Sequence, residues 1–473
     1  MRQQRIAMRA ALAVTAAVTV AACGGTERAD VTTTVGSATT VPTTDSAPPT
    51  SGGTVEALEV PGEYATIQEA VDAAAPGDLV LVAPGVYHEA VTVVTDNLTI
   101  RGLDRNTVVL DGELELDNGV RILGADGVAV ENMTATNYTR NGFYWTGSVG
   151  YRGSYLTAYR TGDYGVYAFD SVNGQLDHIY AAGSPDAGVY IGQCYPCNAV
   201  VSNVVSEHNG LGYSGTNAGG ELYIVNSEFR FNRAGIVPNS GSYELCYPQR
   251  ATTIVGNLVY SNNQPDTPAI DVALLAMGNG IVVAGGTLNL IERNRVFDHD
   301  KSGIGLVPFP EDDPNDTVPG QDEWTLTCEE SKALPVTVPG ESVLWDAYQN
   351  RVIGNVLENN RQADLLLASV GTDISTLGNC FSGNTFTSSS PSAIETLAPC
   401  DATGSGDWTL GGYNIASWLA EQKPPSVDWK TAPLPELGEW ESMPDAATAP
   451  ANPATNVPQP IDIDAIVVPD APA

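Results

Sequence analysis

Four short stretches decide the fold: Gly-Val-Arg-Ile at 119–122, Gly-Phe-Tyr-Trp at 142–145, Gly-Val-Tyr-Ala at 165–168 and Gly-Val-Tyr-Ile at 188–191. A glycine followed by an apolar residue recurs along the chain, at Gly119, Gly142, Gly165, Gly188, Gly210, Gly235, Gly280 and Gly303. Successive glycines are separated by 23, 23, 23, 22, 25, 45 and 23 residues. A fixed period of this size, made of short strand-like segments, predicts a solenoid whose units bury their apolar faces only by stacking.

A second repeated motif, apolar-x-Asn followed by an apolar or polar residue, lies between these glycines. It occurs at Asn132, Asn203, Asn257, Asn294, Asn355 and Asn384. An asparagine that returns at one turn of every unit predicts a ladder of side chains that satisfies backbone groups. Upstream, Thr66 followed by Glu69 forms a capping-box pattern, which predicts a short helix at the start of the domain.

These repeats resemble the right-handed parallel β-helix of the pectate-lyase superfamily, and more closely the NosD-like and carbohydrate-binding or sugar-hydrolase repeats. The Thr66–Val71 opening and Pro84-Gly-Val-Tyr87 are typical of how such solenoids begin. The resemblance covers roughly residues 55–390. It implies an all-β, single-stranded right-handed parallel β-helix with an N-terminal capping helix, and a function connected with polysaccharide.

The regions outside the repeats predict export and anchoring. Residues 1–22 have a basic start and a short apolar run that fits a signal peptide, and the following Cys23 resembles the lipidated cysteine of bacterial lipoproteins. Residues 23–54, rich in Thr, Ser and Pro, are expected to be a tether. We expect the β-helix over 55–400, a C-terminal cap over 401–442, and a disordered Ala/Pro-rich tail over 443–473. This predicts an extracytoplasmic protein that reaches the cell membrane only through its lipid.

Composition excludes one class of partner. The 473 residues contain 56 acidic and 21 basic side chains, a formal net charge of −35. Nucleic acid is therefore excluded as the main partner, because phosphate binding needs a basic surface. Nothing in the sequence predicts an oligomer, and we expect a monomer.

Six cysteines remain after Cys23, an even number that predicts disulfides in an exported protein. Six cysteines allow 15 pairings. The pairing we expect is Cys194–Cys197, Cys246–Cys328 and Cys380–Cys400.

The outer side of the repeats carries the candidate binding residues. If the residue after each glycine points inward, the next one points outward. That position holds Arg121, Tyr144, Tyr167 and Tyr190, followed by Gly212 two residues after Gly210. Tyrosines that return every 23 residues predict a stacked, exposed strip suited to sugar rings. A stack that only stabilises the solenoid remains the alternative.

Residues 132–162 contain no Asp or Glu but three arginines, Arg140, Arg152 and Arg160. Because arginine binds carboxylates and sulfates through two hydrogen bonds, this window predicts a groove for an acidic glycan beside the tyrosines. Binding, with cleavage or remodelling of the glycan, is one hypothesis. A non-enzymatic surface scaffold or adhesion protein is the second, and a metal-handling accessory protein of NosD type is the third.

Candidate catalytic residues lie in the same units. Arg160, Asp163, Tyr164 and Asp170 could supply the base and the charge neutralisation of a polysaccharide lyase, while Asp163, Asp170 and Asp186 are the nearby carboxylates for glycoside hydrolysis. The stretch from Tyr167 to Asp170 resembles part of a mannuronan C5-epimerase motif, but Val172 replaces the histidine of that family. No metal site is predicted with certainty. The acidic segment 311–316 could hold Ca²⁺ or form a solvated loop.

Overall fold

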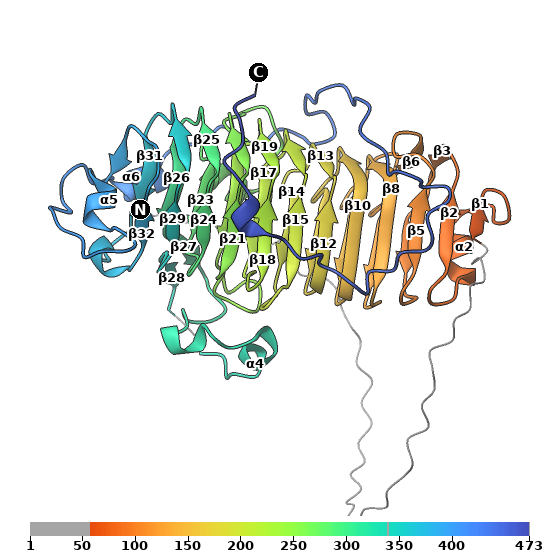
Figure 1. Ribbon diagram of the computed structural model, residues 1–473, viewed down its shortest axis with the longest axis horizontal. Coiled ribbons are helices and arrows are strands. Elements are labelled where there is room, and N and C mark those ends of the chain that lie inside the picture. Colours follow the sequence, from red (N-terminus) through yellow and green to blue (C-terminus); the bar gives the residue numbers. More distant parts are fainter. Residues whose placement is uncertain (1–56, 338–339, 473) are drawn as a thin grey trace, which may run out of the picture. The chain divides into compact units, whose positions relative to one another are not determined.

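The chain folds as a right-handed parallel β-helix, as the repeats predicted (Figure 1). The computed structural model describes residues 57–337 and 340–472, so Cys23, the expected signal peptide and the expected tether lie outside the described residues. Each complete turn contributes one strand to each of three parallel sheets. The long strands β8 and β10 run through both the first and the second sheet and join them.

The strands of the three sheets succeed one another along the chain. The first sheet contains β1 (Leu58–Val60), β2 (Leu79–Val82), β5 (Thr99–Gly102), β8 (Val128–Thr136), β10 (Val149–Tyr159), β12 (Val172–Asp177), β15 (Ala199–Ser202), β18 (Leu222–Val225), β21 (Thr252–Val255), β24 (Leu290–Glu292), β29 (Arg351–Ile353) and β32 (Cys380–Ser382). The second, besides the ends of β8 and β10, contains β3 (Gly85–Tyr87), β6 (Val108–Asp111), β13 (Tyr180–Ala182), β16 (Val205–Glu207), β19 (Glu228–Arg230), β22 (Leu258–Tyr260), β25 (Arg295–Phe297) and β30 (Val356–Glu358). The third contains β4 (Val91–Val93), β7 (Val120–Leu123), β9 (Phe143–Thr146), β11 (Val166–Phe169), β14 (Ala187–Gly192), β17 (Leu211–Thr216), β20 (Ala234–Asn239), β23 (Ile281–Ala284), β26 (Ser302–Val307), β31 (Ala363–Leu367) and β33 (Ser389–Ser390).

The repeated glycines mark the corner at which each turn enters the third sheet. A Cβ atom on Gly142 would lie 2.8 Å from the carbonyl oxygen of Gly165, and one on Gly165 would lie 2.5 Å from that of Gly188. Only glycine lets successive backbones approach this closely. The residue that follows, such as Phe143, Val166 or Val189, is buried in the core, as predicted.

The register differs from the sequence alignment at one turn. Val189 pairs with Tyr213, and Tyr190 pairs with Ser214, so Gly212 occupies the corner that was assigned to Gly210. Because Gly210 and Gly212 are two residues apart, either could be aligned with the corner glycine without changing which side chains point inward. In the observed register the ring of Tyr213 lies in the core. The outward position next to Tyr190 is therefore Ser214.

The repeated asparagines form the expected side-chain ladder. The Oδ1 atoms of Asn294, Asn355 and Asn384 each accept the backbone N–H of the asparagine one turn earlier, at 2.9 Å. Their Nδ2 atoms donate to backbone carbonyls, for example from Asn294 to Ile254 at 2.9 Å. The ladder thus satisfies backbone groups that a parallel turn leaves without partners.

Helices close the solenoid and decorate it. The predicted opening helix is α2 (Ile67–Ala73), whose cap Thr66 accepts the N–H of Glu69. An insertion at residues 308–347 forms the hairpin β27 (Phe309–Asp312) and β28 (Ser342–Trp345), with η1 (Gln321–Glu323) and α4 (Cys328–Lys332) between them. The other helices are α3 (Asp271–Ala276), η2 (Ile374–Thr376), α5 (Ile394–Leu397), α6 (Ile415–Leu419) and η3 (Ile463–Ala465). In the described residues no helix has the length and apolarity needed to cross a membrane.

The structure differs from the expected disordered tail over 443–473. The C-terminal segment, residues 424–470, runs back along the solenoid and crosses the first sheet, in dark blue in Figure 1. Arg101 donates to the carbonyls of Ala449 and Pro450, and Arg295 donates to that of Pro469. Ile466 packs against Val225 and Val255. Arginine side chains of the solenoid hold the segment through its backbone.

The three predicted disulfides, Cys194–Cys197, Cys246–Cys328 and Cys380–Cys400, are all present. The second joins the loop after β20 to α4 across 82 residues, and so ties the insertion to the solenoid. The third closes the last turn of the solenoid.

Candidate functional site

The third sheet carries a strip of three tyrosines on its outer side. Tyr144, Tyr167 and Tyr190 occupy equivalent positions of β9, β11 and β14, which pair in register. The ring centroids are 4.8 Å apart for Tyr144 and Tyr167 and 4.9 Å apart for Tyr167 and Tyr190. Both distances match the spacing of neighbouring strands, roughly 4.8 Å. The rings therefore follow the stacking of the turns.

A fourth tyrosine widens this strip. Tyr164, in the turn before β11, stacks on Tyr167 with centroids 4.2 Å apart and ring planes inclined by 7°. Tyr144, Tyr164 and Tyr167 are each half-buried, so parts of their rings face solvent. We call these three residues the tyrosine face. It is a broad aromatic surface rather than a single column.

The expectation that Tyr190 is exposed is wrong. Its side chain is buried, and its hydroxyl lies 2.7 Å from both carboxylate oxygens of Glu244. Glu244 belongs to the loop between β20 and β21, which folds back over the third sheet. This loop falls within the 45-residue interval of the repeat, where the alignment assigns no strand position. The loop closes one end of the tyrosine strip.

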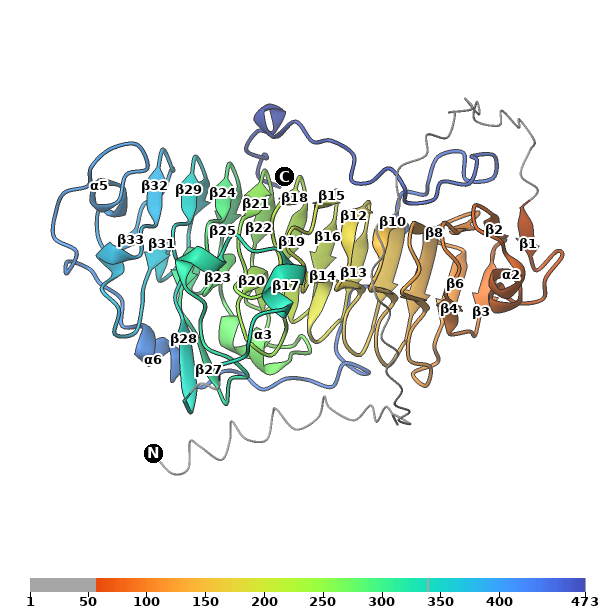
Figure 2. The ribbon, with the colours of Figure 1, turned by 90° about the horizontal axis from the view of Figure 1, so that it is seen from below.

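The insertion fixes this loop in place. Glu311 accepts hydrogen bonds from the backbone N–H and the hydroxyl of Ser242, and the hydroxyl of Tyr247 donates to Asp316. The Cys246–Cys328 disulfide adds a covalent link. Figure 2 shows the insertion, in teal, on the outside of the turns that carry β17 to β23. The wall at the end of the strip is thus held by several contacts.

Two carboxylates stand side by side next to Tyr164. Asp186 is the residue equivalent to Asp163 one turn later, and its backbone N–H donates to the carbonyl of Asp163 at 3.2 Å. Burial raises the pKa of Asp186 well above the usual range of an aspartate, and the charge of Asp163 adds to this shift. Burial also raises the pKa of Asp163, although Arg140 acts in the opposite direction. A proton is therefore retained at this pair more readily than at ordinary aspartates.

A third acid faces the same region from the loop. Burial raises the pKa of Glu244 to about 8, against the effect of the hydrogen bond from Tyr190. Burial is the main cause of the raised pKa of Tyr167, and the charge of Glu244 is the second cause. The raised pKa values favour the uncharged forms of these carboxyl groups, which lowers the cost of placing several of them around aromatic rings.

Asp170 does not belong to this cluster. It follows β11, whereas Asp163 precedes it, so at least roughly 10 Å of extended strand separates the two residues. Asp170 forms an ion pair with Lys332 of α4 at 2.8 Å and so helps to hold the insertion. Because the strand β11 lies between them, Asp163 and Asp170 do not form a catalytic pair. Asp163 and Asp186 are the two acids that lie next to each other.

Two of the candidate arginines border the tyrosine face. Arg121 in β7 pairs across from Tyr144, and its guanidinium donates to Asp117 at 3.1 Å. Arg140 lies 3.4 Å from Asp163 and has a largely exposed side chain. Both stand at the edge of the aromatic surface, where a ligand can reach them.

The other two candidate arginines lie elsewhere. Arg152 is in the first-sheet part of β10 and pairs with Glu131 at 3.3 Å. Arg160 donates to the carbonyls of Trp429, Lys430 and Ala432 in the C-terminal segment. The prediction that they join the tyrosines was wrong because residues 132–162 pass through all three sheets. Closeness in the sequence of a solenoid does not place side chains on one side.

The acidic segment 311–316 has a structural role. Glu311 also accepts the indole N–H of Trp345, and Asp316 accepts the backbone N–H groups of Thr317 and Thr337. Within residues 57–337 and 340–472, no group of three or more His, Cys, Asp or Glu side chains is arranged to hold a metal ion.

Glu244 and Lys332 were missed by the sequence analysis. Both come from segments that interrupt the 23-residue period, so alignment of the turns cannot place them. For Glu244 the signal was the interval of 45 residues between Gly235 and Gly280, which holds an excursion as well as regular turns, and for Lys332 it was the long interval between Gly303 and Asp364.

Comparison with known proteins agrees with the fold. A sequence profile of the family described as right handed beta helix region matches residues 118–307. Comparison with curated proteins gave no match. The A-module of the mannuronan C-5 epimerase AlgE4 from Azotobacter vinelandii is similar at 14% identity and a TM-score of 0.44, with 67% of this chain and 90% of that one covered. An alginate lyase from Paenibacillus sp. has 13% identity and a TM-score of 0.36, with 67% and 91% covered. PfbA, a surface adhesin of Streptococcus pneumoniae, has 13% identity and a TM-score of 0.39, with 71% and 79% covered.

Proposed function

We propose that this protein binds polysaccharide on the tyrosine face. The observation that carries the proposal is the stack of three half-buried rings, in which Tyr144 and Tyr167 follow the spacing of the turns and Tyr164 stacks on Tyr167 within one turn. Sugar rings present C–H groups that pack on aromatic faces, and tyrosine hydroxyls can bond to sugar hydroxyls. A chain of sugars lying along the solenoid meets Tyr144 in one turn and Tyr164 with Tyr167 in the next.

The residues at the two ends of the tyrosine face indicate how a glycan would bind. Arg121 and Arg140 supply donors for sugar hydroxyls or carboxylates at one edge. The loop that carries Glu244 blocks the strip at Tyr190, so a glycan meets a wall there. This geometry favours a glycan that approaches with a chain end at the wall.

The acid pair next to the face supports a catalytic role as a second candidate function. Burial raises the pKa of Asp186 and so favours the protonated form that a general acid needs, while Arg140 beside Asp163 favours the charged form of that second carboxyl group. Glycoside hydrolysis needs two carboxyl groups roughly 5–10 Å apart, and adjacent turns supply backbone positions roughly 4.8 Å apart. Tyr164, against this pair, is the candidate positioning residue.

We also propose an extracytoplasmic location with lipid attachment at Cys23. Three disulfides fit an oxidising compartment. The lipid attachment rests on the sequence pattern of residues 1–23.

A glycan array tests the binding proposal. Wild type and a Tyr144→Ala/Tyr167→Ala variant are compared, with Tyr155→Ala as matched control, since Tyr155 is also half-buried and stacks on an aromatic neighbour, His178, but lies in the first and second sheets. Loss of two stacking rings is expected to weaken binding by about tenfold or more, and Tyr155→Ala is expected to bind as wild type. Equal binding by wild type and the double variant, or none by either, contradicts the proposal.

The same glycans separate a binder from an enzyme. Incubation with wild type is expected to produce new reducing ends without unsaturated sugars if the acid pair hydrolyses the glycan, and Asp186→Asn is expected to stop this while binding persists. Binding without products identifies the scaffold or adhesion protein instead.

A further inference from the structure

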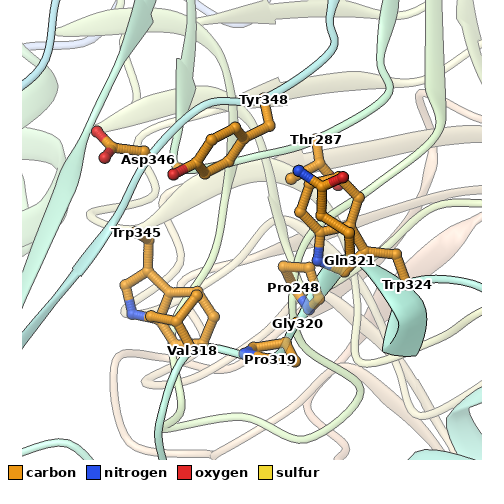
Figure 3. Close-up of a pocket in the computed structure, with 11 residues that line it drawn as sticks. Pro248, Thr287, Val318, Pro319, Gly320, Gln321, Trp324, Trp345, Asp346 and Tyr348 are labelled. Carbon is orange, nitrogen blue, oxygen red and sulfur yellow. The ribbon is translucent and has the colours of Figure 1, made fainter. Parts of the chain in front are cut away.

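A pocket lies between the insertion and the solenoid, outside the tyrosine face. It has a volume of about 170 Å³. The insertion contributes Val318 to Gln321, Trp324 and Trp345 of β28, while Pro248, Thr287 and Tyr348 come from the solenoid and its loops (Figure 3). The pocket and the tyrosine face have no residue in common. The two sites can therefore be altered and tested separately.

Three aromatic side chains form the walls. Trp324 and Tyr348 have ring centroids 5.8 Å apart with planes inclined by 45°. Trp345 is fully buried and oriented by the hydrogen bond from its indole to Glu311 at 2.8 Å. Gly285 lets Trp345 approach, since a Cβ atom there would lie 2.4 Å from the Cβ of Trp345. The walls are thus fixed in position before any ligand enters.

The pocket contains one buried polar group that lacks a partner. The side chain of Trp324 is only 6% exposed, and among residues 57–337 and 340–472 no acceptor lies within hydrogen-bond distance of its indole Nε1. A buried donor without a partner costs free energy, roughly 1–3 kcal/mol. A ligand that brings an acceptor to this atom recovers that cost.

The charged residues around the pocket indicate the charge of the ligand that it can bind. Asp346 is the only acidic lining residue, and no Lys, Arg or His lines the pocket. The two Asp346 oxygens accept from the hydroxyls of Ser369 and Thr372, at 2.5 and 2.6 Å, and Figure 3 shows this carboxylate pointing away from the space between the rings. An anion finds no counter-charge here, and a cation finds a carboxylate already engaged. A neutral ligand fits best.

We propose that this pocket binds a single neutral pyranose ring. The sugar packs its C–H face on the half-buried ring of Tyr348, and one hydroxyl accepts the indole N–H of Trp324. The Gln321 amide and the Tyr348 hydroxyl are further polar groups of the lining. The sugar is a terminal or branch residue of a glycan, since the pocket has room for about one ring.

NMR of protein labelled with ¹⁵N-tryptophan tests this directly. The Trp324 indole signal is assigned by its loss in Trp324→Phe. Methyl glucoside, methyl mannoside and methyl galactoside are titrated separately, with sodium glucuronate as anionic probe and choline as cationic probe. At least one neutral glycoside is expected to move the Trp324 signal downfield in a saturable way, and the two charged probes are not.

Trp440 provides the matched control. Its indole nitrogen is also buried without a partner among the described residues, but it stacks on Tyr180 far from the pocket lining. Its signal is expected to stay in place. Saturation-transfer signals on the bound glycoside are expected to weaken about 3- to 10-fold in Trp324→Phe, which keeps the ring and removes the donor, and to vanish in Trp324→Ala.

The outcomes are distinct. A shift caused by choline or glucuronate instead of the glycosides, or no shift with any of the three glycosides, overturns the proposal. The Tyr144→Ala/Tyr167→Ala variant is expected to retain the Trp324 shift, so failure of the tyrosine face leaves this test intact.

Discussion

Glu244 shows how one side chain can couple the covered end of the tyrosine strip to pH. Its carboxyl group accepts a hydrogen bond from the hydroxyl of Tyr190 at 2.7 Å, and burial is the main cause of its raised pKa. With a pKa raised from 4.5 to about 8, the folded protein keeps a proton that the unfolded chain has lost over this pH range. The free energy of unfolding therefore falls as the pH rises from about 4.5 to about 8.

Glu244→Gln removes this dependence. The amide stays neutral and can still accept from Tyr190, so the variant is expected to be more stable than wild type at pH 8, with a difference that grows from pH 5 to pH 8 by at most about 1.4 kcal/mol per pH unit. Urea unfolding at several pH values measures this. A difference that stays constant with pH, or a variant less stable at pH 8, contradicts the assignment.

Single residues were predictable only where the repeat fixes them. The alignment placed Tyr144 and Tyr167 correctly on the outer side, because their turns keep the 23-residue spacing. It could not show that Tyr190 is covered, since the residues that cover it come from a loop outside the period. Arg160 likewise finds its partners more than 260 residues away in the sequence.

At the scale of elements, the C-terminal segment is held by arginines that bind its backbone carbonyls, and Ile466 adds an apolar contact with Val225 and Val255. Arg101 and Glu131 form an ion pair 2.7 Å long with both side chains fully buried, and the remaining nitrogens of Arg101 donate to the segment. Arg105, Arg293 and Arg295 donate to it in the same way. The segment covers charges that would otherwise face solvent or stay unpaired.

Ending the chain after residue 440 tests this role. It removes the carbonyls of Glu441, Ala449, Pro450, Ile463 and Pro469, each a hydrogen bond worth about 0.5–1.5 kcal/mol. The truncated protein is expected to unfold at lower temperature and to exchange amide hydrogens faster in β5, β8 and β18, with little change in β9 and β11. Unchanged melting and exchange would show that the segment does not stabilise the first sheet.

Composition misled the expectation for this element. A segment rich in Ala and Pro offers few apolar side chains and suggests disorder. Its backbone carbonyls are nevertheless good acceptors, and no pattern within the segment reveals that arginines spaced along the solenoid will bind them. The opening helix and the disulfides were predictable, because capping residues and an even cysteine count are local signals.

At the scale of the whole described molecule, the net charge of −35 and the binding proposal are compatible. The aromatic surface of the third sheet is bordered by Arg121 and Arg140, and burial raises the pKa values of the nearby Asp186 and Glu244, which favours their uncharged forms. The fold could be predicted from the repeat, because the glycines at the corners and the asparagines of the ladder recur at regular intervals in the sequence. The candidate site could be predicted only in part, because the loop that covers Tyr190 and carries Glu244 lies in a segment that interrupts the repeat.

Hydroxyl-radical footprinting with a glycan identified on the array tests the central claim most directly. The account predicts that saturating glycan protects Tyr144 and Tyr167 from oxidation, while Tyr155 on the other sheets stays equally reactive and buried Tyr190 stays unreactive with or without glycan. A glycan that binds and leaves Tyr144 and Tyr167 as reactive as in the free protein would contradict the claim that the tyrosine face is the binding site.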